Sequence, residues 1–455
     1  MLETAVTPCA SGASSACGKG PGCGKRRPPG KGQPGCAFRG AKMALQPIAD
    51  AAHLVHGPAS CETGSWAFRP VHSSGPALHR HSFTSDLDEM SLVHGGERKL
   101  LAAIGGVIER YGAPAVFVYQ TCLPAMTGDD IVAVCRTASA RWFRPVIPIG
   151  APGLAGSRPF GGHLAAEALL RHVIGSREPD YTTPADIALI GEFNLAGELD
   201  RIRRLLSKLK IRVLASITGD GRIAEIAAAH RVKAAVLLCS QGLDGLAEGL
   251  FERFGVPFIE GSFYGAGDTS DTLRRLASLL ASRDAPADLP KRAGELIREQ
   301  EAAIAEPLAR YRSILAGKRA LLLCGGVKSW SIAATLLDAG MEAVAVSVTK
   351  ASDRDRWKVA GVLGNETRMI HKWGDGEMEA LLRSGEVDIV LGGGGALFSA
   401  RRARIPWLEI NHDRSHALCG YEGSLTLLEQ VSRAFASPLW KQAREPAPWP
   451  ERKIS

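Results

Sequence analysis

Short apolar runs alternate with helix-length segments along most of this chain, and this alternation constrains its fold more than any other feature. The runs lie at 115–119, 146–149, 187–190, 212–215, 234–238, 257–259, 320–324, 343–347, 388–391 and 406–410. Segments of about ten residues or more with helical composition separate most of them. A strand followed by a helix and another strand forms a parallel pair, because the helix returns the chain to the start of the sheet. The sequence therefore predicts an α/β protein with parallel sheets.

The predicted strands fall into three groups, which indicates three Rossmann-like domains in tandem. A chain of 455 residues has room for about three domains. The sequence contains neither GxGxxG nor a Walker P-loop, so nothing predicts a bound dinucleotide or ATP hydrolysis by this chain. We expect a basic tail at 1–35, domains at 36–180, 181–316 (with a helical connector from 271) and 317–440, and a second tail at 441–455.

Composition excludes several classes of protein. Hydrophobic residues make up 45% of the chain, which is enough to bury a full core and argues against a disordered protein. Ten cysteines are too sparse for a disulfide-stapled secreted scaffold. No apolar run approaches the ~18–20 residues that a membrane helix needs, and the N-terminal segment lacks a secretory core. We therefore expect a soluble, cytoplasmic protein with no membrane contact.

The net charge of +8 is weak evidence for a nucleic-acid partner. The excess is modest for this length, and part of it lies in residues 1–36, where a solvated tail is the simpler interpretation. No RNA-binding or DNA-binding motif accompanies it. We expect no nucleic-acid partner.

Candidate ligands follow the predicted strands directly. Ligands of doubly wound sheets bind at the carboxyl ends of the strands, and Cys122, Cys239 and the pair Asn411–His412 each come directly after a predicted strand. Cys36 and Cys61 lie in predicted glycine-containing turns. Thiolates in turns can reach iron while nearby backbone N–H groups stabilise the charge of the sulfide, as iron–sulfur ligation requires.

The other cysteines have simpler interpretations. Cys135 in a predicted helix and Cys324 at a strand end are expected to be small hydrophobic residues of the core. The tail carries Cys9, Cys17 and Cys23 without a CxxC pair, so it is a weak zinc site and a flexible segment is expected. For Cys36, Cys61 and Cys122 the spacing alone leaves the cluster and core interpretations open.

Ordered motifs across about residues 35–430 resemble the α-type subunits of nitrogenase component 1. Among these subunits, the chain is most similar to the type called NifE, which matures the iron–molybdenum cofactor. The motifs include Gly35-Cys-Ala-Phe38, Gln46-Pro-Ile-Ala-Asp50, Ala52-His-Leu-Val-His-Gly-Pro58, Ser73-Ser-Gly-Pro76, Thr121-Cys-Leu-Pro-Ala-Met126, Gly191-Glu-Phe-Asn194, Gly219-Asp-Gly-Arg222, Glu260-Gly-Ser-Phe-Tyr-Gly265 and Gly326-Val-Lys-Ser-Trp330.

This resemblance assigns expected roles to the candidate ligands. Cys36, Cys61 and Cys122 match the cysteines that hold an interface iron–sulfur cluster, of 4Fe–4S or P-cluster type, shared with a β-type subunit. Cys239 matches the cysteine that anchors a large nitrogenase-type cluster or a precursor of the iron–molybdenum cofactor. Asn411 falls where a catalytic subunit has its cofactor histidine. NifE also lacks that histidine, so Asn411 is similar to NifE at this position. His412 is either a replacement ligand or catalytic proton donor, or a solvent-facing histidine.

Several departures from the NifE pattern fall beside these positions. Residues 65–70 read Ser-Trp-Ala-Phe-Arg-Pro where NifE has Asp-Asn-Arg-Gly after Ser-Trp, and 392–395 are four glycines where NifE has Gly-Gly-Arg-Asn. Loss of an arginine would remove a forked donor for an anionic cluster. His72, His79 and His81 add imidazoles to a segment that is less basic in NifE. These changes suggest a divergent relative with a remodelled cavity, such as the α-type subunit of a methylthio-alkane reductase.

Two functions follow from the resemblance. In the first, which the departures favour, the chain is a reductase subunit: an ATP-hydrolysing NifH-like iron protein delivers electrons through the interface cluster to the large cluster, which reduces the C–S bond of a methylthio-alkane. In the second, the chain is a scaffold on which a cofactor precursor matures. Both imply a β-type partner, similar to NifN or NifK, in an α2β2 heterotetramer. A purely structural subunit is disfavoured, because Cys36, Cys61, Cys122 and Cys239 all stand at motif positions.

Overall fold

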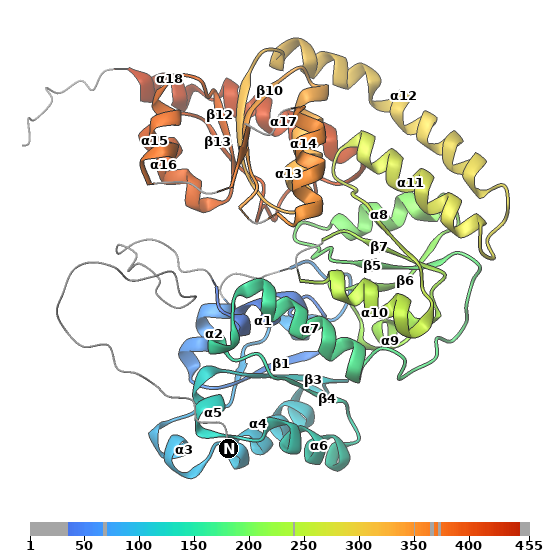
Figure 1. The fold of residues 1–455 in the computed structure, drawn as a ribbon, viewed down its shortest axis with the longest axis vertical. Coiled ribbons are helices and arrows are strands. Elements are labelled where there is room, and N and C mark those ends of the chain that lie inside the picture. Colours follow the sequence, from blue (N-terminus) through green and yellow to red (C-terminus); the bar gives the residue numbers. More distant parts are fainter. Residues whose placement is uncertain are drawn as a thin grey trace, which may run out of the picture. The chain divides into compact units, whose positions relative to one another are not determined.

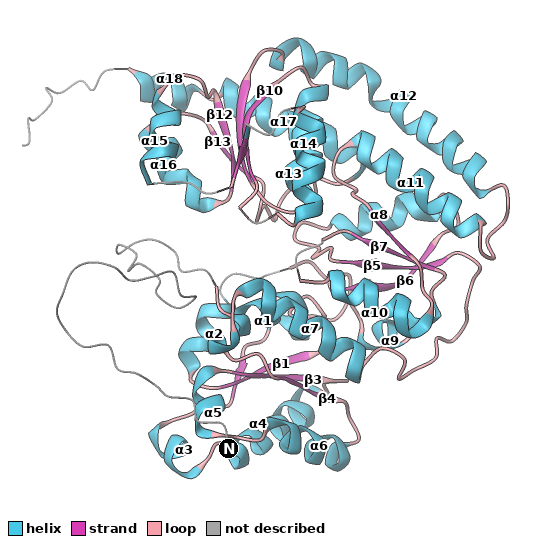
Figure 2. Cartoon of the chain, in the orientation of Figure 1, coloured by secondary structure: helices cyan, strands magenta, loops and turns pink. Residues whose placement is uncertain are grey.

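Three parallel sheets organise the described part of the chain (Figures 1 and 2). The computed structural model describes residues 35–66, 71–239, 242–349, 351–364, 368–371 and 375–445. The predicted N-terminal tail with Cys9, Cys17 and Cys23, and residues 67–70 of the departure at 65–70, lie outside these residues. Residues 35–455 make up one unit, and the statements below concern its described residues.

All strand pairs within the three sheets are parallel, as the sequence predicts. The first sheet has the order β2 (Phe83–Thr84), β1 (Ala52–His56), β3 (Val116–Gln120), β4 (Val146–Ile149). The second has the order β6 (Arg212–Ile217), β5 (Asp186–Ile190), β7 (Ala234–Leu237), β8 (Phe258–Glu260). The third has the order β11 (Met369–Ile370), β10 (Glu342–Ser347), β9 (Arg319–Leu323), β12 (Ile389–Gly392), β13 (Trp407–Glu409).

Helices connect the strands and cover the sheets (Figure 2). Their apolar faces bury residues at helical spacing, for example Leu199, Ile202 and Leu206 of α8. The helices are α1 (Ala37–Leu45), α2 (Ala59–Trp66), α3 (Glu89–His94), α4 (Glu97–Tyr111), α5 (Cys122–Thr127), α6 (Ile131–Trp142), α7 (Arg158–His172), α8 (Glu198–Ser207), α9 (Ile223–Ala227), α10 (Asp244–Phe254), α11 (Ala266–Ala281), α12 (Leu289–Leu315), α13 (Val327–Asp338), α14 (Asp353–Leu363), α15 (Asp375–Arg383), α16 (Leu397–Arg402), α17 (Gly420–Ala436) and α18 (Pro438–Arg444).

The structure differs from the sequence expectation in the segment before α7. Its glycines and prolines predict a loop from 150 to 162, but α7 already begins at Arg158. Pro159 is compatible with the first turn of a helix, where its missing N–H has no partner to lose. Gly161 and Gly162 are inside the helix because another part of the chain approaches them closely. The strand β1 is also absent from the prediction, since its two buried histidines, His53 and His56, interrupt the apolar pattern.

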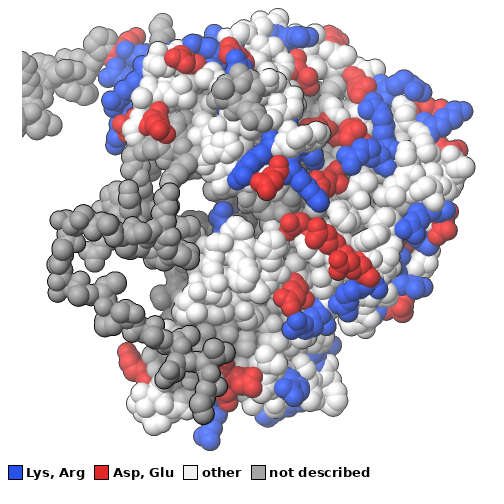
Figure 3. Space-filling view, in the orientation of Figure 1, with Lys and Arg blue, Asp and Glu red and all other residues white. Residues whose placement is uncertain are grey.

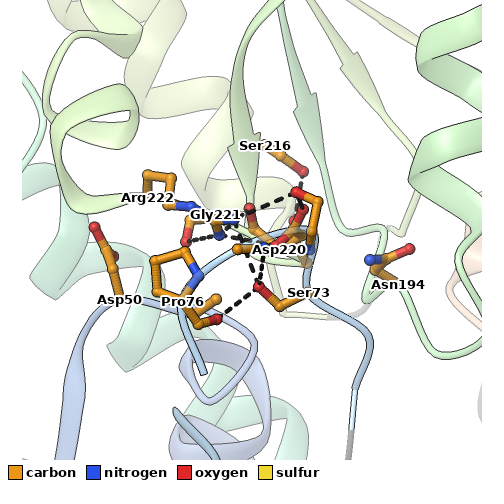
Figure 4. Close-up of polar contacts among 12 residues, drawn as sticks. Asp50, Ser73, Pro76, Asn194, Ser216, Asp220, Gly221 and Arg222 are labelled. Carbon is orange, nitrogen blue, oxygen red and sulfur yellow. Dashed lines mark hydrogen bonds and ion pairs between the residues drawn. The ribbon is translucent and has the colours of Figure 1, made fainter. Parts of the chain in front are cut away.

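A buried aspartate fastens the loop after residue 70 to the second sheet. The side chain of Asp220 is 1% exposed and accepts hydrogen bonds from the backbone N–H and hydroxyl of Ser74, at 3.2 and 2.6 Å. Arg222 and Arg203 pair with the same carboxylate at 2.8 and 3.4 Å. Figure 4 shows Asp220 and Arg222 facing the loop that carries Ser73. Burial alone would raise the pKa of Asp220, but the hydrogen bonds from Ser74 and Arg222 and the charge of Arg222 lower it overall.

Charged side chains of both signs intermix on the face drawn in Figure 3. Among the described residues visible there, the basic side chains do not form one continuous patch. Of the helices in the described ranges, none is long and apolar enough to cross a membrane.

We predict that Asp220→Asn destabilises the protein by about 2–4 kcal/mol, because two partly buried arginines lose their counter-charge. Asparagine tolerates the left-handed backbone of this position (φ 47°), so the substitution tests the charge and not the turn. The measurement is urea denaturation. The matched control is Asp284→Asn, whose ion pair with Lys233 is exposed and should change the free energy of unfolding by less than about 0.5 kcal/mol. Equal effects of the two substitutions would contradict the assignment.

Candidate functional site

A very close crossing of α1 and α7 positions Cys36. A Cβ on Gly40 would lie 1.9 Å from the carbonyl oxygen of Arg158, and a Cβ on Gly161 would lie 1.9 Å from that of Ala37. Only glycine permits backbones to approach this closely. Cys36 is the N-cap residue of α1, and the next N–H, of Ala37, donates to the carbonyl of Gly156 at 2.9 Å. The crossing thus holds Cys36 against the segment that leads into α7.

The structure brings Cys36, Cys61 and Cys122 together. Cys122 begins α5 directly after β3, as predicted, whereas Cys61 lies within α2 and not in a turn. A Cβ on Gly153 would lie 2.9 Å from the sulfur of Cys122 and 3.2 Å from that of Cys36. Burial raises the pKa of Cys61, and the thiols of Cys122 and Cys36 raise it further. All three side chains are partly buried.

This set of donors fits a cluster better than a single metal ion. Within the described ranges, no group of three or more His, Cys, Asp or Glu residues is arranged to hold one ion. An iron–sulfur cluster is a larger core gripped by one thiolate at each iron, so its ligands stand further apart. Gly153 carries no side chain, and its backbone lies so close to two of the sulfurs that a Cβ there would press on them. Three neighbouring thiols fit an iron–sulfur cluster whose remaining ligands come from elsewhere.

A buried ion pair joins the helices that carry two of these thiols. Lys42 of α1 and Glu62 of α2 pair with each other, and both side chains are 2% exposed. Burial lowers the pKa of Lys42, while the charge of Glu62 and the hydrogen bond to it oppose that change. Because Glu62 follows Cys61 directly, the pair fixes α2 relative to α1 beside the thiols.

A second site is a cavity of about 250 Å³ at the carboxyl ends of strands from two sheets. It collects residues that follow β5, β7, β9 and β13. Cys239, Asn411 and His412, all predicted from the sequence, line it. The remaining lining residues are Met43, Arg158, Gly191, Glu192, Phe193, Leu195, Leu238, Tyr264, Leu323, Cys324, Gly325, Gly326, Val327, Lys328, Ser347 and Thr349.

Cys239 is positioned by the end of the neighbouring strand. It follows β7, which pairs with β5 up to Ile190 and Leu237. A Cβ on Gly191 would lie 2.6 Å from the Cβ of Cys239, and Gly191 has a φ of +91°. Both the space and the backbone conformation therefore require glycine at 191. This residue opens the motif Gly191-Glu-Phe-Asn194.

Asn411 and His412 occupy different environments. The amide of Asn411 donates to the carbonyl of Leu323 at 3.1 Å, which ties it to the end of β9. The backbone N–H groups of both residues donate to Glu409, at 2.8 and 3.0 Å. The side chain of His412 is 56% exposed and its Nδ1 lies 4.0 Å from the Glu409 carboxylate. The side chain of Asn411 is thus held by a hydrogen bond to the backbone at the end of β9, while the imidazole of His412 is more than half exposed.

Three charged or polar residues of this cavity were not predicted from the sequence. Burial raises the pKa of Glu192 to about 7, and the charge of Glu198 adds to the rise. The hydroxyl of Tyr264 donates to Glu192 at 3.3 Å. The ammonium of Lys328 donates to the carbonyl of Ile410 at 2.9 Å and lies 4.9 Å from the centre of the Tyr264 ring. Glu192 and Cys239 each lie two residues after the end of a strand, and this position was the available signal.

Several other sequence candidates lie away from the cavity. His79 is buried against the backbone carbonyls of Ala49 and Val71, which is a structural role. Among the described lining residues, neither His72 nor His81 appears. Cys135 is buried in the core, as expected, whereas Cys324 is buried and also lines the cavity. Side chains at 394 and 395, the positions of the lost NifE residues, would meet nothing within 4 Å.

The chain belongs to the family described as nitrogenase component 1 type oxidoreductases, whose sequence profile matches residues 36–436. It is 49% identical over 428 residues to the nitrogenase iron-molybdenum cofactor biosynthesis protein NifE of Bradyrhizobium diazoefficiens, covering 94% of this chain and 78% of that protein. The same identity over 429 residues relates it to NifE of Mesorhizobium japonicum, with 94% and 86% covered. A solved structure titled nitrogenase Cp1 at pH 6.5 superposes with a TM-score of 0.84 at 25% identity, covering 94% and 93% of the two chains.

The raised pKa of Glu192 predicts a pH-dependent stability. Between the usual glutamate pKa of about 4.3 and about 7, the folded chain holds a proton that the unfolded chain has lost, so stability falls as pH rises through this range. Glu192→Gln removes this fall and should stabilise the protein at about pH 8 by up to a few kcal/mol. Urea denaturation at about pH 5 and about pH 8 measures it. The exposed Glu295→Gln serves as control, and an unchanged pH profile in Glu192→Gln would contradict the assignment.

Proposed function

We propose that this chain is the α-type scaffold subunit on which an iron–sulfur precursor of a nitrogenase cofactor matures. The single observation that carries the proposal is the pair of separate thiol sites: three cysteines brought together by α1, α2 and α5, and Cys239 in a cavity at the strand ends of the second and third sheets. The relatives named for cofactor biosynthesis, 49% identical over 94% of this chain, support the same function.

The two sites have different proposed ligands. Cys36, Cys61 and Cys122 bind a resident iron–sulfur cluster, which supplies one-electron transfer when it is bound. Cys239 binds the precursor, which is cargo. Lys328 places a positive charge beside this cargo site, and His412 offers an imidazole that is more than half exposed.

The thiol count supports a partner subunit. An iron–sulfur cluster of this kind has at least four ligand positions, and the described residues bring three cysteines together. We propose that a β-type subunit similar to NifN supplies the others in an α2β2 heterotetramer, and that a NifH-like iron protein acts on the complex.

The methylthio-alkane reductase is the weaker candidate. It is favoured by the departures from NifE at 65–70 and 392–395. Residues 67–70 lie outside the described part, and positions 394 and 395 do not belong to the described lining of the cavity. The names of the relatives also favour the scaffold.

One experiment separates the two functions. The chain is purified without oxygen together with its β-type partner, then mixed with the iron protein, ATP and a source of molybdenum and homocitrate. Transfer of a competent cofactor to apo-nitrogenase supports the scaffold. Release of methanethiol from a methylthio-alkane, without such transfer, would overturn it in favour of the reductase.

Cys239→Ala is expected to remove the cargo cluster and to spare the resident cluster, because the two thiol sites share no residue. Iron content should fall only by the amount of iron in the cargo cluster, and the EPR signal of the resident cluster should persist. Cys135→Ala is the matched control, since Cys135 is a core residue 1% exposed and should leave iron content unchanged. Full iron content in Cys239→Ala would refute the assignment.

Gly153→Ala is expected to reduce iron at the three-cysteine site. Its new methyl group would press on the sulfurs of Cys122 and Cys36, at 2.9 and 3.2 Å before any relaxation. Gly150→Ala adds the same methyl group three residues earlier, where nothing lies within 4 Å, and should retain its iron. Iron analysis and EPR of the purified complex distinguish them, and equal iron in both variants would count against a cluster at this site.

A further inference from the structure

A hollow separate from the cavity around Cys239 lies between α11 and α14, away from the residues assigned to either cluster. Its volume is about 360 Å³, and Trp330 of α13 forms part of its wall. Asp268, Asp271 and Arg275 follow one face of α11, at intervals of three and four residues. Trp357 and Gly361 occupy one face of α14 in the same way. A Cβ on Gly361 would meet nothing within 4 Å, so the space beside Trp357 is open.

The exposed tryptophan is the first unusual feature of this hollow. Trp357 is 78% exposed, although tryptophan buries more apolar surface than any other side chain. Trp330, by contrast, is 6% exposed, and its indole N–H donates to Asp355 at 3.2 Å. The ammonium of Lys358 lies 4.3 Å from the centre of its ring. The face of Trp357 is therefore available to a ligand, while that of Trp330 is already covered.

A carboxylate with one buried oxygen that accepts no hydrogen bond is the second feature. The described cations that line the hollow already have partners: Arg275 contacts Asp271, and Lys358 contacts Glu260. Asp268 has no ion pair within 4 Å among the described residues, and its buried Oδ2 accepts no hydrogen bond there. Burial raises the pKa of Asp268 to about 6; Asp271 and Asp338 add to the rise, while Ser331 and Lys358 oppose it. Above about pH 6 Asp268 therefore carries a negative charge that no ion pair within 4 Å neutralises among the described residues.

We propose that this hollow is a docking site for an arginine side chain of a partner protein. A guanidinium group is planar and permanently charged; it stacks on an aromatic face and donates forked hydrogen bonds to a carboxylate. Trp357 supplies the face and Asp268 supplies the carboxylate. A lysine ammonium satisfies the charge but not the planar stacking. Tryptophan and arginine are also the residues that most often dominate the energy of protein interfaces.

The probe is a short blocked peptide, Gly-Arg-Gly, compared with Gly-Lys-Gly by calorimetric titration of the full chain with its β-type partner. We expect the arginine peptide to bind at least about fivefold tighter at about pH 7.5. Trp357→Ala and Asp268→Asn should each weaken it by about fivefold or more. Controls are Phe398→Ala, an aromatic residue 73% exposed, and Asp353→Asn, an exposed carboxylate; neither lines the hollow.

Acidification supplies a readout that a structural role would not produce. As the pH falls through about 6, Asp268 gains a proton and binding of the arginine peptide should weaken, whereas Asp268→Asn should show no such dependence. Equal affinity for the two peptides, unsaturable binding, or wild-type affinity in Trp357→Ala and Asp268→Asn would each overturn the proposal. The titration needs no bound cluster, so its outcome is independent of the proposed scaffold function.

Discussion

Parallel pairing of strands is the constraint on which both thiol sites depend. In each sheet it brings the carboxyl ends of all strands to one edge, where the backbone leaves the sheet and side chains become accessible. Cys122 follows β3, Cys239 follows β7 and Asn411 follows β13. None of these residues needs a special local structure to reach its site. The fold therefore creates the two sites at sheet edges, and the chemistry depends on which side chains stand there.

Glycine then decides how closely neighbouring elements approach at those edges. Gly40 and Gly161 let α1 and α7 cross with almost no space between their backbones, which sets Cys36 beside Cys122. Gly191 performs the same task at the cavity, where the end of β5 lies against Cys239. A methyl group at any of these three positions would displace a thiol without altering a ligand. Their importance is thus geometric, and it is separate from the chemistry of the cysteines.

The sequence predicts the strands well because strand runs are local: each predicted run differs from its observed strand by at most two residues at either end. It failed where tertiary contact overrides composition, as in the glycine-containing start of α7 and the histidine-containing β1. It predicted Cys239, Asn411 and His412, which the structure places around one cavity, from their positions after strands. It missed Glu192 and Lys328, since the burial that makes a charged side chain unusual is not visible in a single sequence. The arrangement of the three thiols also required coordinates, because Cys36 precedes its sheet.

The central claim is that these cysteines hold inorganic iron and sulfide, and iron analysis of the intact complex tests it most directly. The chain should be produced without oxygen, together with its β-type partner and an iron–sulfur assembly system, and purified as the intact complex. The account predicts a brown complex that contains iron and acid-labile sulfide and gives the EPR signals of iron–sulfur clusters. A folded, colourless complex free of iron would contradict it.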